Sequence, residues 1–329
     1  MDIIVIGKIL GGLLFLVFGG DLLVRGASNL AKAFGIPSIV IGLTIVALGT
    51  SAPELAVSIE AALIGRSDIA VANIVGSNIF NILFILGVSA LICPLIVNRN
   101  IIKRDLPLLI GISVLIFLFS LGGVIGRVEG AILFVIAIVY TYFLIWEAIK
   151  DKKIYLQKDT QLNEVEEVKA KQSVWVSIVL IIVGLGIIMI GADWLIQGSV
   201  TVAKLMGVSD TVIGLTIIAV GTSLPEVVAS IIATIKGERD IAIGNVIGSN
   251  IYNILIILGA SAFVVPGGSG LTVNNTLLYF DIPVMIAVAV LCFLIFWTGR
   301  KVSRFEGAIF LFSYIGYMIY LIRTATIAG

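Results

Sequence analysis

The chain has 329 residues, of which 60% are hydrophobic and only 12% are charged. An ordinary soluble domain is roughly 45–50% apolar and about 25% charged, so this composition predicts a membrane protein. The net charge of +1 excludes the basic surface of a nucleic-acid-binding protein. The absence of histidine excludes Ser–His hydrolases and histidine-ligated metals.

Ten apolar stretches are long enough to cross a bilayer, which takes about 20 helical residues. In chain order they lie near residues 3–24, 36–64, 69–93, 105–122, 128–148, 174–196, 208–235, 241–265, 281–299 and 305–325. The segment 150–173 is charged and contains few apolar residues, so we interpret it as a solvated linker. It separates a first five-span unit, residues 1–149, from a second, residues 174–329.

The distribution of basic residues predicts the orientation in the membrane. If the N-terminus is outside, sixteen of the 21 Lys and Arg residues fall on the inner side. Cytoplasmic loops are enriched in these residues. We therefore expect a multi-pass protein of the cell membrane with both termini outside and the linker in the cytoplasm.

The two halves are copies of each other. Positions 20–92 align without gaps to positions 192–264, with 38 identities in 73 pairs. Because each copy holds an odd number of spans, the second must enter the membrane from the opposite side. The sequence thus predicts an all-α integral membrane protein of ten transmembrane helices in two inverted five-helix repeats, an architecture typical of secondary transporters.

Each half places a carboxylate in the middle of an apolar span. Glu54 ends the segment GTSAPE, and Glu226 ends the matching segment GTSLPE. A carboxylate at this depth is costly unless it is paired or solvated, and the sequence offers no Lys or Arg at a comparable depth. Two such groups without a basic partner predict a bound cation.

The residues around each carboxylate offer further oxygen atoms. Pro53 and Pro225 lack an N–H and should break the helix, which frees backbone carbonyls just before them. Broken backbone at membrane depth is tolerated where it lines a cavity or an ion path. The same segments add the hydroxyl groups of Thr50, Ser51, Thr222 and Ser223.

A second repeated motif, GSNIFN in one half and GSNIYN in the other, lies in the following span. Its serine and its last asparagine are four residues apart and share one helical face. We favour a ligand role for these residues, which are Ser77, Asn81, Ser249 and Asn253. Asn78 and Asn250 fall on another face, and we interpret them as interhelical hydrogen-bonding residues.

The predicted site consists of oxygen atoms, which hard cations prefer. Ca²⁺ takes six to eight oxygen ligands, and two carboxylates neutralise one Ca²⁺. The same oxygens could hold Na⁺ ions in turn, so that the two cations would compete. Without histidine, and with Cys93 and Cys292 in apolar segments, softer transition metals are disfavoured.

These motifs resemble those of the cation/Ca²⁺ antiporter superfamily, and specifically of the prokaryotic sodium/calcium exchangers. The two characteristic repeats of that family correspond to residues 41–87 and 213–259, and the similarity extends over both halves. The resemblance implies an ion-binding core formed by spans 2, 3, 7 and 8. Spans 1 and 6 would be long, tilted and able to slide across this core.

The resemblance also implies roles for individual residues. Glu54 and Glu226 would bridge a central Ca²⁺ site and flanking Na⁺ sites, and Asn81 would line the central region. Serines would contribute side-chain oxygens, namely Ser51, Ser77, Ser223 and Ser249. Backbone carbonyls would come from Thr50 and Thr222 for Ca²⁺, and from Ala47 and Ala219 for the outer Na⁺ positions. Asn253 matches a position that is acidic in potassium-dependent relatives, so its neutrality argues against potassium coupling.

The function favoured by the sequence is Na⁺-driven, electrogenic Ca²⁺ antiport by alternating access. The alternatives are Ca²⁺/H⁺ or other cation antiport and, less favoured, a cation channel. An intramembrane hydrolase is disfavoured because no histidine or mid-span lysine could activate a nucleophile. We expect no enzymatic activity, no cofactor and no protein partner. The expected interactions are with Ca²⁺ and Na⁺ as substrates and with the lipid bilayer.

Overall fold

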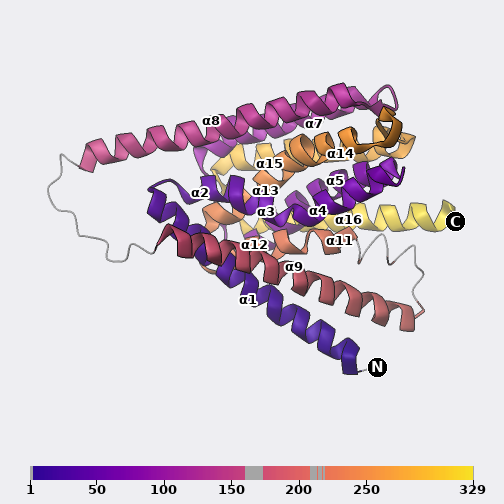
Figure 1. The fold of residues 1–329 in the computed structure, drawn as a ribbon, viewed down its shortest axis with the longest axis horizontal. Helices are drawn as coiled ribbons and strands as arrows, with labels where there is room; N and C mark the ends of the chain where they lie inside the picture. Colours follow the sequence, from indigo (N-terminus) through magenta and orange to yellow (C-terminus); the bar gives the residue numbers. More distant parts are fainter. Residues whose placement is uncertain (1–2, 160–172, 208–212, 214–216, 218, 329) are drawn as a thin grey trace.

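The computed structural model describes residues 3–159, 173–207, 213, 217 and 219–328. Nearly all of these residues are helical, as the sequence predicts (Figure 1). In this part of the chain, seven helical spans are long and apolar enough to cross a membrane. Ser38–Thr50 and Ala52–Leu63, bent by 44°, make an eighth if they are counted as one span.

The ten predicted spans are therefore confirmed in part. The span predicted at 105–122 contains α7 (Leu106–Ser120), which has 15 residues. The span predicted at 208–235 lies partly outside the described residues, and its described end is the 12-residue helix α12 (Leu224–Ile235). The first and sixth spans are longer than predicted, because α1 (Ile3–Phe34) and α9 (Val174–Leu205) each contain 32 residues.

The other elements of the first half are α2 (Ser38–Ile41), η1 (Gly42–Val46), α3 (Ala47–Thr50), α4 (Ala52–Leu63), α5 (Ser67–Phe80), η2 (Asn81–Leu86), α6 (Gly87–Ile92), η3 (Ile101–Asp105) and α8 (Arg127–Asp159). Those of the second half are α11 (Ala219–Thr222), α13 (Arg239–Tyr252), η5 (Asn253–Leu258), α14 (Gly259–Val264), η6 (Pro266–Gly268), η7 (Leu277–Asp281), α15 (Ile282–Gly299) and α16 (Arg304–Ala328). All η elements except the short 3₁₀ turn η6 are π-helical. From α4 to α6 every boundary recurs in the second half at the position to which the sequence alignment of the halves assigns it.

Two short antiparallel sheets connect the halves. Strand β1 (Leu95–Ile96) pairs with β4 (Lys301–Val302), and β2 (Val124–Ile125) pairs with β3 (Leu271–Thr272). Each sheet takes one strand from each half, so the backbone hydrogen bonds of the connecting segments fix the halves to each other.

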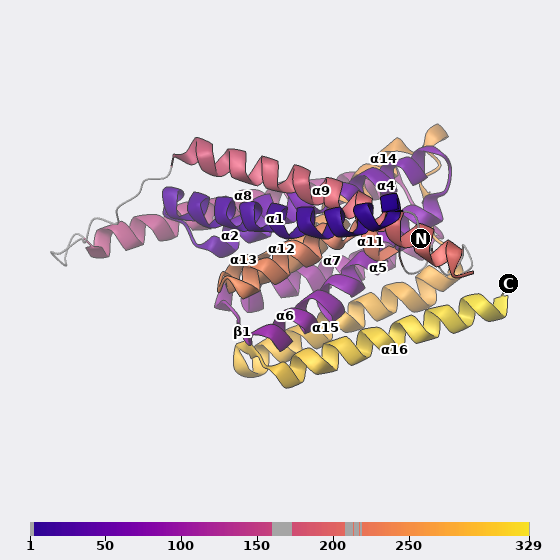
Figure 2. The same cartoon turned by 90° about the horizontal axis from the view of Figure 1, so that it is seen from below.

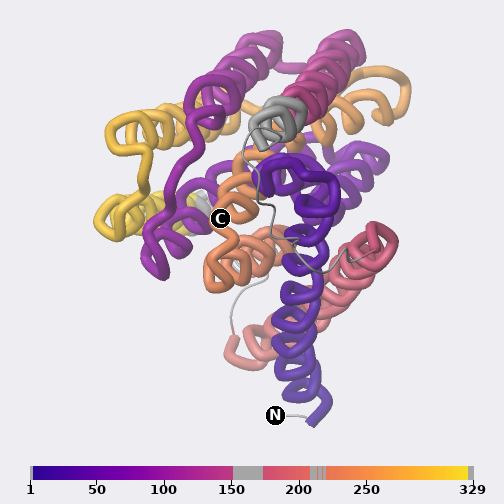
Figure 3. Tube along the Cα trace, turned by 90° about the vertical axis from the view of Figure 1, so that its left-hand side faces the viewer, coloured from indigo at the N-terminus to yellow at the C-terminus, as the bar shows by residue number. Residues whose placement is uncertain are grey.

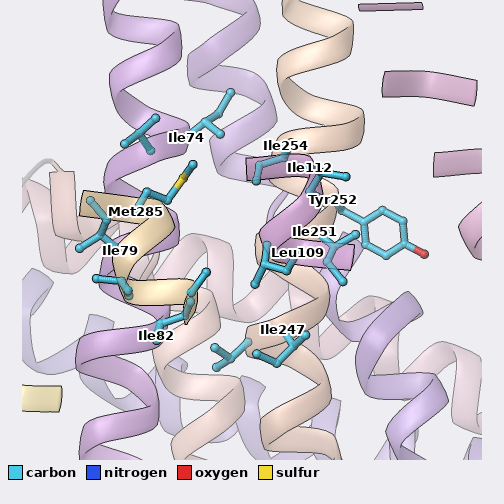
Figure 4. Close-up of a cluster of buried hydrophobic side chains, with 14 of the residues drawn as sticks. Ile74, Ile79, Ile82, Leu109, Ile112, Ile247, Ile251, Tyr252, Ile254 and Met285 are labelled. Atoms are coloured by element: carbon cyan, nitrogen blue, oxygen red, sulfur yellow. The ribbon is translucent and has the colours of Figure 1, made fainter. Parts of the chain in front are cut away.

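Helices α5 and α13 lie at the centre of the molecule. Every residue from 241 to 252 of α13 is buried. Figure 4 shows isoleucines of these two helices packed with residues of α7 and α15, among them Ile74, Ile79, Ile247 and Met285. The polar side chains of Ser77 and Asn78 on α5 and of Ser249 and Asn250 on α13 are likewise buried in protein.

The outer helices expose large apolar side chains. On α8 these include Ile138 and Tyr142, and on α16 they include Phe312. Figure 2 shows α16 along the side of the molecule away from α9. Such apolar surface on long helices is suited to contact with lipid. Together with the length and hydropathy of the seven spans, it indicates a multi-pass membrane protein.

Helices α1 and α9 form a closely packed antiparallel pair at one side of the molecule (Figures 1 and 3). Every seventh residue along the contact is a glycine of α1 that meets the backbone of α9. A Cβ atom added to Gly12, Gly19 or Gly26 would lie 2.8 Å from the carbonyl oxygen of Gly191, Gly184 or Ser177, respectively. Small residues at such positions let two membrane helices approach each other closely.

One end of α1 is also tied to the second half by polar contacts. Asp21 forms a salt bridge with Arg25 at 2.8 Å and another with Lys236, which follows α12. The Ser28 hydroxyl donates a hydrogen bond of 2.5 Å to Glu238, which follows Lys236 in the connection between α12 and α13. Polar contacts thus link one end of the α1–α9 pair to the end of α12 in this conformation.

The glycine contact predicts a large effect of a single methyl group. Gly19→Ala should destabilise the protein by about 1–3 kcal/mol, because the methyl group would meet the Gly184 carbonyl and Ile188. Thermal unfolding in detergent measures the change. Gly7→Ala on the same helix is the control, because nothing lies within 4 Å of its added Cβ atom. Equal unfolding temperatures for the two variants would contradict the close approach.

Candidate cation-binding site

The two repeated carboxylates lie just after breaks in the helices, as the sequence predicts. Ser51 separates α3 from α4, with φ −79° and ψ 10°, and Pro53 occupies the first turn of α4. In the second half, Ser223 separates α11 from α12, with φ −87° and ψ 7°, and Pro225 occupies the first turn of α12. A proline at this position loses no helical hydrogen bond, so each carboxylate sits in the first turn of a new helix.

Each carboxylate is bonded to a serine of the opposite half. The Ser51 hydroxyl donates a 2.8 Å hydrogen bond to Glu226 Oε1, and the Ser223 hydroxyl donates a 2.8 Å bond to Glu54 Oε1. Ser77 Oγ lies 3.1 Å from Ser223 Oγ and 3.5 Å from Glu54 Oε1. These contacts bring both breaks and one serine of α5 into a single cluster. Both carboxylates are fully buried.

The asparagines of the second motif lie on the central helices. Asn81 and Asn253 begin the π-helical turns η2 and η5, and both are fully buried. Asn81 Nδ2 donates to Asn250 Oδ1 at 2.9 Å, and Asn253 Nδ2 donates to Asn78 Oδ1 at 3.1 Å. The prediction that Asn78 and Asn250 form interhelical hydrogen bonds is confirmed, because each also donates to the other's backbone carbonyl.

Four oxygen atoms of these residues have no donor. In the described part of the chain, eight buried side-chain N or O atoms have no hydrogen-bond partner. Four of the eight are Glu54 Oε2, Glu226 Oε2, Asn81 Oδ1 and Asn253 Oδ1. A buried acceptor without a partner costs roughly 1–3 kcal/mol, and more when it is charged. All four atoms belong to residues for which the sequence predicts a ligand role.

The remaining predicted ligands are not arranged alike in the two halves. The Thr50 hydroxyl lies 3.1 Å from Asn245 Oδ1 and 3.3 Å from the Ala47 carbonyl. Ser249 does not mirror Ser77: its hydroxyl donates to the Ala47 carbonyl at 3.4 Å. In the second half, α11 begins at Ala219 and ends at Thr222, directly before the break.

Two asparagines near the carboxylates were missed in the sequence. Asn73 Nδ2 donates to the Glu54 carbonyl at 3.3 Å and to Ser58 Oγ at 3.0 Å. Asn245 Nδ2 makes the matching bonds, to the Glu226 carbonyl at 3.3 Å and to Ser230 Oγ at 2.9 Å. They hold the backbone of the first turn of α4 and α12. Their matching positions in the two aligned halves are the signal that could have found them.

The donor set is suited to a hard cation. It consists of carboxylate, amide, hydroxyl and carbonyl oxygens, which Ca²⁺, Na⁺ and similar ions prefer. Among the described residues there is no group of three or more His, Cys, Asp or Glu side chains, the usual requirement for a transition metal. Neither Glu54 nor Glu226 takes part in the salt bridges found in this part of the chain.

A family model described as "Sodium/calcium exchanger protein" matches residues 4–146 and 176–323. The chain belongs to the sodium/calcium exchanger family. The resemblance inferred from the two repeated motifs is therefore confirmed. Proteins of this family are transporters rather than enzymes.

Two relatives of this family member match along nearly their whole length. The candidate antiporter CaxA of Alkalimonas amylolytica is 41% identical over 95% of this chain and 97% of its own. The sodium/calcium exchanger MaX1 of Methanosarcina acetivorans is 36% identical over 94% and 96%. A solved structure of the sodium-calcium exchanger NCX_Mj is 30% identical, with a TM-score of 0.82 over 98% of this chain and 100% of its own.

The two buried carboxylates, which form no salt bridge in the described part of the chain, predict how the stability of the protein responds to cations. Glu54→Gln should be at least as stable as the wild type in chelator, because it removes a buried charge that lacks a cationic partner. Ca²⁺ at 100 times its dissociation constant should stabilise the wild type by about 2.7 kcal/mol but not the variant. Thermal unfolding with and without Ca²⁺ measures both effects.

Glu60→Gln provides the matched control for this measurement. Glu60 is an exposed carboxylate on the same helix, α4, and its counterpart in the second half is Ile232. This variant should respond to Ca²⁺ as the wild type does. A Ca²⁺ response retained in full by Glu54→Gln would show that Glu54 is not a ligand.

Proposed function

We propose that the protein exchanges Na⁺ for Ca²⁺ across the cell membrane by alternating access. The observation that carries this proposal is the set of four buried oxygens without donors, two of them on carboxylates. Two carboxylates balance the charge of one Ca²⁺, and several weaker Na⁺ contacts could use the same oxygens in turn. The names of MaX1 and NCX_Mj, both sodium/calcium exchangers, support the choice of ions.

The proposed architecture is ten transmembrane helices in two inverted repeats of five. Residues 1–149 form the first repeat, 150–173 the cytoplasmic linker and 174–329 the second repeat, with both termini outside. The helix boundaries that recur at matching positions of the two halves support the duplication. The excess of basic residues on one side supports the orientation.

The proposed ligands comprise side chains and backbone carbonyls of both repeats. The central Ca²⁺ would bind Glu54, Glu226 and the carbonyls of Thr50 and Thr222. The amides of Asn81 and Asn253 would line the central region. The flanking Na⁺ ions would use the side-chain oxygens of Ser51, Ser77, Ser223 and Ser249 and the carbonyls of Ala47 and Ala219. The serine–carboxylate bonds between the halves support one shared site rather than two separate ones.

The arrangement around this site supports the proposal of alternating access. The site lies between two breaks that come from opposite halves. The α1–α9 pair packs next to these breaks, because a Cβ atom added to Gly49 or Gly221 would meet Leu185 or Ile196 of α9. We propose that this pair moves as one unit across the core, so that the site opens first to one side and then to the other. Its glycine contact supports movement of the two helices together.

The test is ⁴⁵Ca²⁺ uptake into proteoliposomes driven by an outward Na⁺ gradient. The wild type and Glu60→Gln should accumulate Ca²⁺, whereas Glu54→Gln and Glu226→Gln should lose uptake, because each removes one of two charges that balance Ca²⁺. Thermal unfolding in detergent checks that the inactive variants are folded. Uptake at the wild-type rate in both carboxylate variants would contradict the proposed site.

Two further conditions in the same vesicles separate the remaining alternatives. If three Na⁺ exchange for one Ca²⁺, each cycle moves one net charge, so a potential set by K⁺ and valinomycin should change the rate. A rate independent of voltage would indicate electroneutral exchange. Uptake driven by a pH gradient without Na⁺ would favour Ca²⁺/H⁺ antiport instead.

A further inference from the structure

The central helices α5 and α13 cross at a symmetric pair of asparagines that the proposed site does not use. Asn78 Nδ2 donates to the Asn250 carbonyl at 3.1 Å, and Asn250 Nδ2 donates to the Asn78 carbonyl at 3.0 Å. Both side chains are at most 1% exposed. A backbone carbonyl can only accept, so the amide nitrogen of each side chain must face the opposite helix.

This constraint fixes the second atom of each amide. Since the nitrogen of Asn78 is engaged by a carbonyl, its remaining side-chain atom is an oxygen, which can only accept. The neighbouring Asn253 must then present its own nitrogen, as the 3.1 Å bond between them requires. The oxygen of Asn253, on the other side of the amide from this bond, has no donor among the described residues. The other pair has the same arrangement, because Asn81 Nδ2 donates to Asn250 Oδ1 at 2.9 Å.

We propose that Asn78 and Asn250 are positioning residues that aim the amide oxygens of Asn253 and Asn81 at the transported cation. An unrestrained buried amide could present either its oxygen or its NH₂ group to the site, and only the oxygen is attractive to a cation. Each positioning residue acts on the ligand of the opposite half. The inference rests on the proposed function, because it assigns a role within the same cation site.

The inference makes a specific prediction about which variants are coupled. Asn78→Ala removes the acceptor that holds Asn253, so it should weaken Ca²⁺ binding by about as much as Asn253→Ala. Loss of one neutral hydrogen-bonding group corresponds to roughly 2- to 12-fold in affinity. Once Asn253 is alanine, Asn78 has no amide to orient. The double variant Asn78→Ala, Asn253→Ala should therefore bind Ca²⁺ within about 2-fold of Asn253→Ala alone.

The control combines Asn78→Ala with a change at Asn81, the ligand asparagine of the same half. The double variant Asn78→Ala, Asn81→Ala should show the product of the two single losses, because Asn81 is oriented by Asn250. A purely structural role for Asn78 would lower the unfolding temperature in chelator without producing this difference between the two partners. The mirror pair, Asn250→Ala with Asn81→Ala, gives a second cycle if Asn78→Ala does not fold.

The experiment is equilibrium ⁴⁵Ca²⁺ binding to the purified full chain in detergent, for the wild type, the four single variants and the double variants. The inference is supported if the losses of Ca²⁺ affinity do not multiply when Asn78→Ala is combined with Asn253→Ala, or Asn250→Ala with Asn81→Ala. The losses for Asn78→Ala with Asn81→Ala should multiply. Multiplicative losses for all pairs, or wild-type affinity in Asn78→Ala and Asn250→Ala, would overturn it while leaving the proposed function intact. A wild type that binds no Ca²⁺ would instead overturn the proposed function, and the inference with it.

Discussion

Two buried carboxylates that form no salt bridge with any of the residues the structure describes are the constraint on which the rest of the structure depends. Glu54 and Glu226 are fully buried, and the donors to their Oε1 atoms are serine hydroxyls. A charge removed from water needs compensation, and a hydroxyl group supplies only part of it. In the proposed account, a bound cation supplies the rest of this compensation. A transporter also needs a site that is not permanently satisfied by its own side chains, because such a site could not release and rebind its substrate.

Matching elements of the two halves hold these groups in place. The breaks at Ser51 and Ser223 place the carboxylates, and the π-helical turns η2 and η5, which continue α5 and α13, place the amides. The two small sheets and the asparagine crossing join one half to the other. The α1–α9 pair has a different character, because glycine contacts make it closely packed within itself. A closely packed helix pair beside a closely packed core is suited to the proposed movement, in which the pair would shift without internal repacking.

Much of the site could be predicted from the sequence because its chemistry is unusual for a membrane span. A mid-span carboxylate next to a proline, present twice, identified Glu54, Glu226 and the breaks before them. The role of Asn78 as an interhelical residue followed from helical periodicity, which places it on another face than Ser77 and Asn81, and from the usual role of such polar residues in membrane helices. The family resemblance extended the ligand set to backbone carbonyls, which composition and spacing cannot assign.

Other features depend on which helices meet, and a single sequence does not contain this information. The glycines at every seventh position of α1 have meaning only opposite α9. Asn73 and Asn245 looked like ordinary polar residues until the structure placed them against the carbonyls of Glu54 and Glu226. Ser249 differs from Ser77 although both follow a glycine and precede an asparagine, because its hydroxyl faces the Ala47 carbonyl. The π-helical turns and the orientation of each amide likewise follow from packing rather than from local propensity.

The central claim is that one set of oxygens serves both cations, and competition at equilibrium tests it most directly. Ca²⁺ binding to the purified protein should be measured over a range of Na⁺ concentrations at constant ionic strength. The account predicts that the apparent dissociation constant for Ca²⁺ rises without limit as Na⁺ increases, and more steeply than in direct proportion, because several Na⁺ ions displace one Ca²⁺. An apparent dissociation constant that is unaffected by Na⁺, or that levels off at high Na⁺, would show that the two cations bind at separate sites and would contradict the account.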